Sequence, residues 1–337
     1  MRAEYPKGEE QKVVRGEWQQ VRGCTQCSVL AFALSSHFAA EYPKGEDGLC
    51  FAATTDGLYR SDDGGCSWQP QAGALEGVPV TTVALSPSFH DDQMIFVGGP
   101  GGVARSIDGG QSWRLGRFPV PALNISTLAL SPNFDQDGIL FAGSLEDGLF
   151  RSEDRGVNWG SFNFRLLDLN VLTLGISPDF AEDEIVLAGT GSALFRSHNG
   201  GLAWREADLP LEAAPVLSLT LSPGFARDRL AFAGTETGGL FRSEDQGRRW
   251  EAVDGPLTGR CVNAVALSPT FPQDGVILAA AETGLHLSED GGQSWAHWAD
   301  LADALCVAIV PGSTGGLLAL AGLGDRGIWR LTLDPPT

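Results

Sequence analysis

The chain has little positive charge and no long hydrophobic run. It has 23 lysine and arginine residues against 42 aspartate and glutamate residues, a net charge of −19, and only three of the basic residues are lysines. Phosphate groups are bound by clustered lysine and arginine, so this balance argues against nucleic acid as a partner. No apolar run approaches the ~20 residues of a membrane-spanning helix, so we expect no membrane insertion.

Cysteine is also sparse, and the amino terminus has no apolar core. Six cysteines in 337 residues are too few for a disulfide scaffold. We interpret Cys24 and Cys27 as incidental loop thiols, with metal binding or redox chemistry as the alternatives. The first ten residues lack the hydrophobic segment of a secretory signal, which predicts a cytoplasmic protein, or an extracytoplasmic one if a signal has been removed.

Glycine is abundant, with 44 residues, and one motif, Ser-x-Asp-x-Gly-x-x-Trp, recurs along the chain. Its serines follow one another every 45 or 46 residues, at Ser61, Ser106, Ser152, Ser197, Ser243 and Ser288. The acidic or amide position is occupied by Asp63, Asp108, Asp154, Asn199, Asp245 and Asp290, and the tryptophans are Trp68, Trp113, Trp159, Trp204, Trp250 and Trp295. Copies at such regular spacing identify an internal repeat.

Each repeat contains four short runs rich in leucine, aromatic and β-branched residues. In one repeat these are Leu128–Phe134, Ile139–Gly143, Gly148–Ser152 and the run that starts at Trp159. Glycine, proline, aspartate and asparagine separate them, and none has the length or period of a helix, so we predict four strands, named A to D, and no helices. Four short strands per repeat are the sequence signature of a propeller blade.

The two ends of the chain decide the number of blades. The last repeat ends after a C strand at Gly327–Arg330, and Gly16–Val21 has the pattern of an isolated D strand with Trp18 at the motif position. We therefore predict an all-β, seven-bladed β-propeller with four-stranded antiparallel blades, in which the N-terminal strand completes the last blade. The expected boundaries are 1–11 for an N-terminal tail, 12–333 for the propeller and 334–337 for a C-terminal tail.

Each part of the motif has a physical role in a tight turn between strands C and D. Serine and aspartate oxygens accept hydrogen bonds from the backbone N–H groups of the turn. The glycine permits a positive φ, and the tryptophan buries its ring between adjacent sheets while its N–H finds an acceptor. We therefore interpret the motif residues as determinants of the fold, because one carboxylate per turn is too few for calcium.

An arginine precedes the motif in most repeats. These residues are Arg60, Arg105, Arg151, Arg196, Arg242 and Arg330. A ring of guanidinium groups that binds anions is one interpretation. Because the arginine recurs in nearly every repeat, we favour pairing with neighbouring carboxylates or carbonyls.

The repeat resembles the Asp-box, or BNR, repeat of the sialidase-like propellers. That family includes sialidases, xyloglucanase-type glycoside hydrolases, sortilin-like receptors and the photosystem II assembly and stability factor propellers. The resemblance covers nearly the whole chain and is specific for the blade type rather than for an activity. It implies that the Asp boxes lie on the face away from the functional site, and that the D–A and B–C loops form the functional face.

The sequence departs from the pattern of sialidase catalysis. The resemblance would imply an arginine triad, a Tyr–Glu nucleophile pair and an acidic aspartate, but the A strands carry no arginine and the chain has only three tyrosines. A glycoside hydrolase of any type needs two facing carboxylates at a defined separation. The acidic loops of the expected functional face supply many carboxylates, so a glycoside hydrolase of the Asp-box type is the alternative function.

We predict a non-catalytic binding or scaffold propeller that presents its loop-lined face to a protein or carbohydrate partner. The predicted ligand-binding residues on that face are Glu146, Asp147, Glu236, Glu282, Trp298 and Asp325. No catalytic residue, cofactor or metal site is predicted. The protein is expected to be a monomer.

Overall fold

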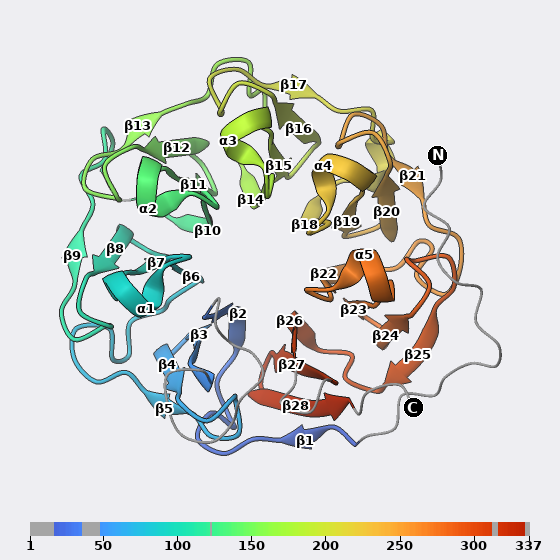
Figure 1. Ribbon diagram of the computed structural model, residues 1–337, viewed down its shortest axis with the longest axis horizontal. Helices are drawn as coiled ribbons and strands as arrows, with labels where there is room; N and C mark the ends of the chain where they lie inside the picture. The colour runs from blue at the N-terminus through green and yellow to red at the C-terminus, as the bar shows by residue number, and fades with distance from the viewer. Residues whose placement is uncertain (1–16, 36–47, 122, 312–315, 334–337) are drawn as a thin grey trace.

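The strands of the computed structural model form a ring of four-stranded antiparallel sheets (Figure 1). The structure describes residues 17–35, 48–121, 123–311 and 316–333, and within these ranges there are seven sheets. The expected all-β, seven-bladed propeller is thereby confirmed. The two predicted tails, 1–11 and 334–337, lie outside the described residues.

Blades 1 to 4 follow one another along the chain. Blade 1 contains β2 (Val29–Leu34), β3 (Cys50–Thr54), β4 (Gly57–Ser61) and β5 (Gln69–Pro70). Blade 2 contains β6 (Thr82–Leu85), β7 (Ile95–Gly99), β8 (Gly102–Ser106) and β9 (Arg114–Leu115). Blade 3 contains β10 (Ile125–Leu130), β11 (Leu140–Ser144), β12 (Leu149–Ser152) and β13 (Gly160–Ser161). Blade 4 contains β14 (Val171–Ile176), β15 (Val186–Thr190), β16 (Leu194–Ser197) and β17 (Arg205–Glu206).

Blades 5 to 7 complete the ring. Blade 5 contains β18 (Val216–Leu221), β19 (Ala231–Thr235), β20 (Leu240–Ser243) and β21 (Glu251–Ala252). Blade 6 contains β22 (Val262–Leu267), β23 (Ile277–Ala281), β24 (Gly284–Ser288) and β25 (Ala296–Ala299). Blade 7 contains β26 (Ala304–Pro311), β27 (Leu317–Leu323), β28 (Ile328–Leu333) and β1 (Gln19–Gln20).

The strands of each blade are ordered from the axis of the ring to its rim. Figure 1 shows the first strand of each blade nearest the axis and the short fourth strand at the periphery. The second strand lies inside the sheet and is buried along its whole length in blades 1 to 6, which explains why it carries no charged residue and is apolar except for a terminal serine or threonine.

The N-terminal strand closes the ring as predicted. β1 pairs with β28 in antiparallel register, with Gln19 opposite Arg330 and Gln20 opposite Trp329 (Figure 1). The backbone N–H of Val21 extends the pairing by donating to the carbonyl of Ile328 at 3.0 Å. Residues from the two ends of the chain therefore share one sheet.

Short helices connect the first two strands of blades 2 to 6, and here the expectation of no helices is wrong. They are α1 (Phe89–Asp92), α2 (Phe134–Asp137), α3 (Phe180–Asp183), α4 (Phe225–Asp228) and α5 (Phe271–Asp274), and a 3₁₀ turn, η2, spans Leu211–Ala213. One turn of helix is too short to show a helical period in the sequence. None of the helices in the described ranges has the length and apolarity needed to span a bilayer.

The core lies between neighbouring blades rather than within one sheet. Trp68, from the turn that leads into β5, is buried in a cluster that includes Leu320 of β27 and Ile328 of β28. Trp159 of blade 3 likewise packs in a cluster with Phe96 of blade 2. Each turn tryptophan thus packs against the blade before its own, which is why the units need one another for burial.

Candidate functional site

The two faces of the ring are built from different loops. On one face, the A–B connections bond to the motif turns, as in the 3.1 Å hydrogen bond from Arg155 N–H to Gly138 carbonyl. On the other, the B–C hairpins bond to the D–A loops, as in the 3.0 Å bond from Gly148 N–H to Leu169 carbonyl. We call these the Asp-box face and the hairpin face.

The motif turn of blade 2 shows how the motif residues are used. Asp108 Oδ1 accepts from the Ser106 hydroxyl at 2.7 Å and from Ser112 N–H at 2.8 Å, while its Oδ2 accepts from the Ser112 hydroxyl at 2.5 Å. Gly110, at φ 91°, donates its N–H to Ser106 Oγ and accepts from Trp113 Nε1 at 3.1 Å. The bonds from Ser112 and Ser106 lower the pKa of Asp108 to about 2, so the carboxylate is charged and bonded within its own turn.

The same turn recurs in the other blades with small variations. The indole N–H groups of five motif tryptophans donate to the carbonyl of the motif glycine three residues earlier, in Trp68, Trp113, Trp159, Trp250 and Trp295. Trp204 donates instead to the Phe162 carbonyl at 2.9 Å. Trp18 Nε1 is buried without a hydrogen-bond partner among the described residues.

The recurring arginines connect each blade to the next. Five of them donate to a carbonyl in the motif turn of the following blade, in the pairs Arg105 with Arg155, Arg151 with Gly200, Arg196 with Gln246, Arg242 with Gly291 and Arg330 with Gly64. Three of the six recurring arginines form an ion pair with an acid two residues later, in the pairs Arg60 with Asp62, Arg151 with Glu153 and Arg242 with Glu244. These contacts match the predicted pairing of the recurring arginines with neighbouring carboxylates or carbonyls.

The predicted acidic ligand residues lie in B–C hairpins of the hairpin face. Their hairpins belong to four blades, with Glu146 and Asp147 in blade 3, Glu236 in blade 5, Glu282 in blade 6 and Asp325 in blade 7. All except Asp147 are exposed. The structure therefore distributes the predicted residues around the ring instead of gathering them in one cleft.

The charges of two of these acids act on the thiol of Cys261. Burial, followed by the charges of Glu236 and Glu282, raises the pKa of the Cys261 thiol. Cys261 Sγ donates to Asn263 Oδ1 at 3.3 Å, and Glu282 accepts from Arg260 at 3.5 Å. Within the described part of the chain, no three His, Cys, Asp or Glu side chains are placed to hold a metal ion.

Trp298 lies at the joint between blades 6 and 7. Its ring packs edge-on against Trp18, with centroids 5.3 Å apart and an interplanar angle of 70°. Both rings are partly buried against a cluster that includes Leu285 and Leu323. Much of the Trp298 surface is therefore used in packing, although the residue stays a predicted ligand contact.

Carboxylates in the D–A loops are held in their charged form. Partial burial acts to raise the pKa of Asp168, but hydrogen bonds from Asn170 and Ser192 outweigh it and lower the pKa. The Arg326 guanidinium, which pairs with Asp303, lowers the pKa of that carboxyl. These two loops present ionised carboxylates at neutral pH, which is unlike the raised pKa of a general acid.

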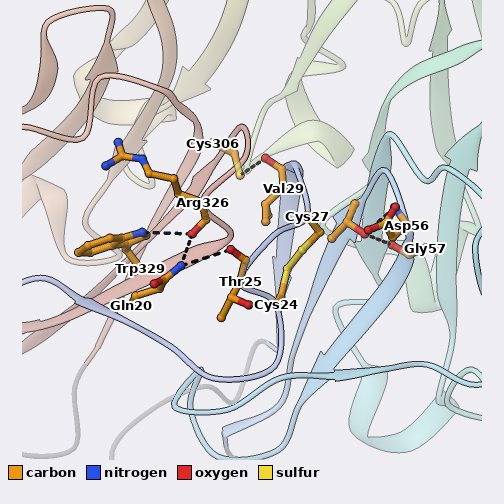
Figure 2. The surroundings of a disulfide bond; sticks show 11 residues. Gln20, Cys24, Thr25, Cys27, Val29, Asp56, Gly57, Cys306, Arg326 and Trp329 are labelled. Carbon is orange, nitrogen blue, oxygen red and sulfur yellow. Dashed lines mark hydrogen bonds between the residues drawn. A yellow bond between two sulfur atoms is a disulfide. The ribbon is translucent and has the colours of Figure 1, made fainter.

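Cys24 and Cys27 form a disulfide in the loop from β1 to β2, so their interpretation as loop thiols is wrong (Figure 2). Their Cα atoms lie 5.9 Å apart, and both residues are buried. A Cys-x-x-Cys spacing permits either state, and the choice depends on how the loop is folded. Here the Cys24 carbonyl accepts from Ile328 N–H at 3.2 Å, and a side chain at Gly327 would collide with it.

Comparison with known families identifies the repeat. Residues 149–161, which contain the C strand and motif turn of blade 3, match the family model of the BNR-Asp box repeat. The chain is a seven-bladed propeller that carries this Asp-box repeat. No curated protein matches its sequence significantly.

Solved structures share the fold of this Asp-box propeller at low identity. The extracellular domain of BT4673 from B. thetaiotaomicron has a TM-score of 0.70 and 18% identity, over 93% of this chain and 39% of that chain. The propeller thus spans well under half of that longer chain. YCF48 bound to D1 peptide has a TM-score of 0.67 and 18% identity over 98% of both chains, and YCF48 from Cyanidioschyzon merolae has a TM-score of 0.63 and 17% identity over 94% of this chain and 98% of that chain. At these identities the similarity establishes the fold.

Several residues that shape the hairpin face of the propeller were missed at the sequence level. Asn163 joins a D–A loop to the hairpin of Asp147, because its Nδ2 donates to Asp147 carbonyl at 2.9 Å and its Oδ1 accepts from Leu149 N–H at 2.7 Å. Asp303, in the D–A loop that leads into blade 7, forms an ion pair with Arg326 in the B–C hairpin of that blade. These residues have no counterpart in every repeat, so periodicity could not reveal them.

Proposed function

We propose that this propeller is a non-catalytic binding platform that holds a protein partner on its hairpin face. The observation that carries the proposal is the bonding of B–C hairpins to D–A loops around the ring. In blade 4, Asp168 Oδ2 accepts from both the N–H and the hydroxyl of Ser192, at 2.8 and 2.7 Å. Loops tied in this way present a surface that needs little ordering when a partner binds.

The neighbouring structures support a protein rather than a small-molecule partner. YCF48, which shares the fold over nearly the whole of both chains, has been solved with a D1 peptide. The peptide is a property of YCF48, and its identity does not transfer to this chain. For this propeller we propose a polypeptide partner that tolerates or complements an acidic surface, given the net charge of −19.

We also propose that the protein works in an oxidising compartment. A buried disulfide persists where thiols are not kept reduced, which favours the extracytoplasmic location over the cytoplasmic one. The BT4673 neighbour, an extracellular domain, is consistent with such a location. Non-reducing mass spectrometry of protein from its native source tests this, because a fully reduced Cys24 and Cys27 would contradict the proposal.

The binding face is tested by charge reversal. Glu236→Lys with Glu282→Lys changes the hairpin face, and Asp135→Lys with Glu153→Lys makes the same charge change near the Asp-box face. The proposal predicts that partners captured from the native source by the wild type are lost with the first variant and retained with the second. Equal retention by both variants would contradict it.

A glycoside hydrolase is the competing outcome of the same tests. Inverting and retaining enzymes need carboxyl groups about 5 to 9.5 Å apart, whereas the predicted acids lie in hairpins of four blades. A hydrolysis screen on β-glucans and sialosides should show no turnover. Turnover that is lost on changing Glu146→Gln or Glu236→Gln would replace the binding proposal with an enzymatic one.

A further inference from the structure

The rim of blade 2 breaks the charge pattern of the recurring arginine. Arg105 stands at the same strand position as Arg60, Arg151 and Arg242, each of which pairs with an acid two residues later. In blade 2 that later position is occupied by Ile107, which is 55% exposed. Arg105 therefore lacks the counter-charge that three of its counterparts have at this position.

The strand beside Arg105 adds a second positive charge. β8 pairs with β9 so that Arg105 lies directly opposite Arg114. The corresponding partners are Gln69 in blade 1, Gly160 in blade 3 and Glu251 in blade 5. Like charges directly opposite one another destabilise a sheet, so this pair has a cost that blades 1, 3 and 5 avoid.

The two arginines line a hollow in the surface. The hollow has a volume of about 320 Å³ and is lined by Arg105, Ile107, Asp108, Ser112 and Arg114. Arg105 donates to the Arg155 carbonyl at 3.3 Å. Among the described residues, neither Arg105 nor Arg114 forms an ion pair within 4.0 Å. Most of the donors of two guanidinium groups thus remain open to a ligand.

Asp108 is the one carboxylate in the hollow, and its oxygens are already bonded. Both accept from Ser112, and Oδ1 also accepts from Ser106. With two guanidinium groups and one carboxylate, the hollow has a net positive charge on a chain of −19. The unpaired arginines Arg105 and Arg114 depart from the charge pattern of the repeat without an evident benefit to the fold. Such departures are expected at functional positions.

We propose that this hollow is an oxyanion-binding site, in which Arg105 and Arg114 together hold a carboxylate or phosphate group and Ile107 contacts the apolar atoms next to it. Paired guanidinium groups suit such a group because their planar N–H donors match two oxygens of one anion. The site lies on the rim and not on the hairpin face, so it stands or fails independently of the proposed function.

A second arginine pair shows what the hollow requires. Arg196 lies opposite Arg205 in blade 4, and His198 takes the place of the acid. Arg196, however, is only 9% exposed, and its Nε donates to the Gln246 carbonyl at 2.8 Å. This arginine is used within the fold, so we expect no oxyanion binding there.

The experiment follows the arginine Nε–H signals of the full chain by NMR at constant ionic strength. One arm adds inorganic phosphate, and the other adds N-acetylglutamate amide, which carries a single carboxylate. The proposal predicts a saturable shift of the Arg105 and Arg114 signals in at least one arm. The arm with the higher affinity identifies the source of the oxyanion.

Four variants make the test specific. Ile107→Glu restores the acid found in blades 3 and 5 and should weaken binding at least tenfold, whereas Ile107→Gln, of the same size without the charge, should weaken it less than twofold. Arg114→Gln should also weaken binding at least tenfold. Arg60→Gln is the matched control, because Arg60 is already paired with Asp62, and it should leave binding unchanged.

Each outcome bears on the proposal. No saturable shift of either signal in either arm, or an equal loss in Ile107→Glu and Ile107→Gln, would overturn it. An equal loss in Arg60→Gln would show general charge attraction and would also overturn it. Thermal melting of each variant is compared with wild type, and Arg114→Gln supplies the test if Ile107→Glu does not fold.

Discussion

The joint that closes the ring, between blades 7 and 1, has the same tryptophan packing as the joints between consecutive blades but a different connection along the chain. Between blades 4 and 5, the chain is continuous, Trp250 is buried with its indole N–H bonded to Gly247 carbonyl, and Arg196 bonds across the joint. At the closure, the two blades come from opposite ends of the sequence. There β1, which has two residues like the fourth strands of blades 1 to 5, pairs with β28 within blade 7.

Further bonds hold the closing strand and the loop that follows it. The Cys24–Cys27 disulfide fixes the loop that follows β1, and Gln20 Nε2 donates to Arg326 carbonyl at 2.8 Å (Figure 2). Arg330 bonds across to Gly64 carbonyl at 3.1 Å, as Arg196 does to Gln246 between blades 4 and 5. Every joint of this propeller repeats the same packing. At the closure, the disulfide and the Gln20 hydrogen bond are added to that packing.

The largest expected effect separates the two kinds of tryptophan. Trp250→Ala removes a buried ring and its hydrogen bond, so it should lower the free energy of unfolding by about 3 to 5 kcal/mol. Trp18→Ala should cost clearly less, because Trp18 is only partly buried and its N–H makes no hydrogen bond within the described residues. Urea denaturation of both variants measures the difference, and equal losses would show that Trp18 is a full equivalent of the other six.

The disulfide should have the next largest effect. Replacing both Cys24 and Cys27 by alanine should lower the free energy of unfolding by about 2 kcal/mol, since the bond closes a very short loop in the unfolded chain. Reducing agent should shift wild-type stability by a similar amount. Cys66→Ala is the control, because Cys66 is a free, exposed cysteine. A loss in the control as large as in the double variant would contradict the assignment.

Blade 6 should make stability depend on pH. His286 replaces the aromatic residue found at Phe150, Phe195 and Phe241, and burial followed by the charge of His297 lowers its pKa. In the unfolded chain His286 binds a proton near pH 6.5, whereas in the folded chain it binds one only at a lower pH. The protein therefore has its full stability above pH 6.5, and its stability falls as the pH decreases toward the pKa of folded His286. Denaturation between pH 5 and 8 should show this fall in wild type and a smaller one in His286→Phe. The same pH dependence in both proteins would rule out His286 as its source.

The smallest expected effect concerns the one motif turn without a carboxylate. Asn199 Oδ1 accepts from Ser197 Oγ at 2.9 Å and from Ala203 N–H at 3.0 Å. Asn199→Asp should strengthen both bonds by adding charge, and raise the free energy of unfolding by about 0.5 kcal/mol. The reverse change, Asp245→Asn, is the matched control and should lower it by a similar amount. A change of the same sign in both would contradict the role given to this position.

The fold could be predicted from the sequence because the same turn recurs at a nearly constant spacing. Trp18 and Gly327–Arg330 also predicted how the ring closes, since each end lacks the strand that the other supplies. The one-turn helices were missed because a segment such as Phe134–Asp137 is shorter than a readable helical period. The disulfide was missed because the spacing of Cys24 and Cys27 does not decide between thiols and a bond.

The candidate site was only partly predictable. Strand order placed Glu146 and Glu282 on the hairpin face, because B–C hairpins of all blades must share one face. It could not show that the charges of Glu236 and Glu282 would both act on Cys261, since that depends on how loops in different blades fold. The hollow of blade 2 depends on the pairing register of Arg105 and Arg114, which only the structure supplies.

Ring closure is tested most directly by cross-linking the two ends of the chain. Gln19→Cys with Arg330→Cys, in a Cys66→Ala background, places two cysteines at paired positions of β1 and β28. Mild oxidation should form an intramolecular disulfide in this variant and none in Gln19→Cys with Arg242→Cys, whose second position lies in blade 5. Absence of the first cross-link, or equal formation of both, would contradict a ring closed by the N-terminal strand.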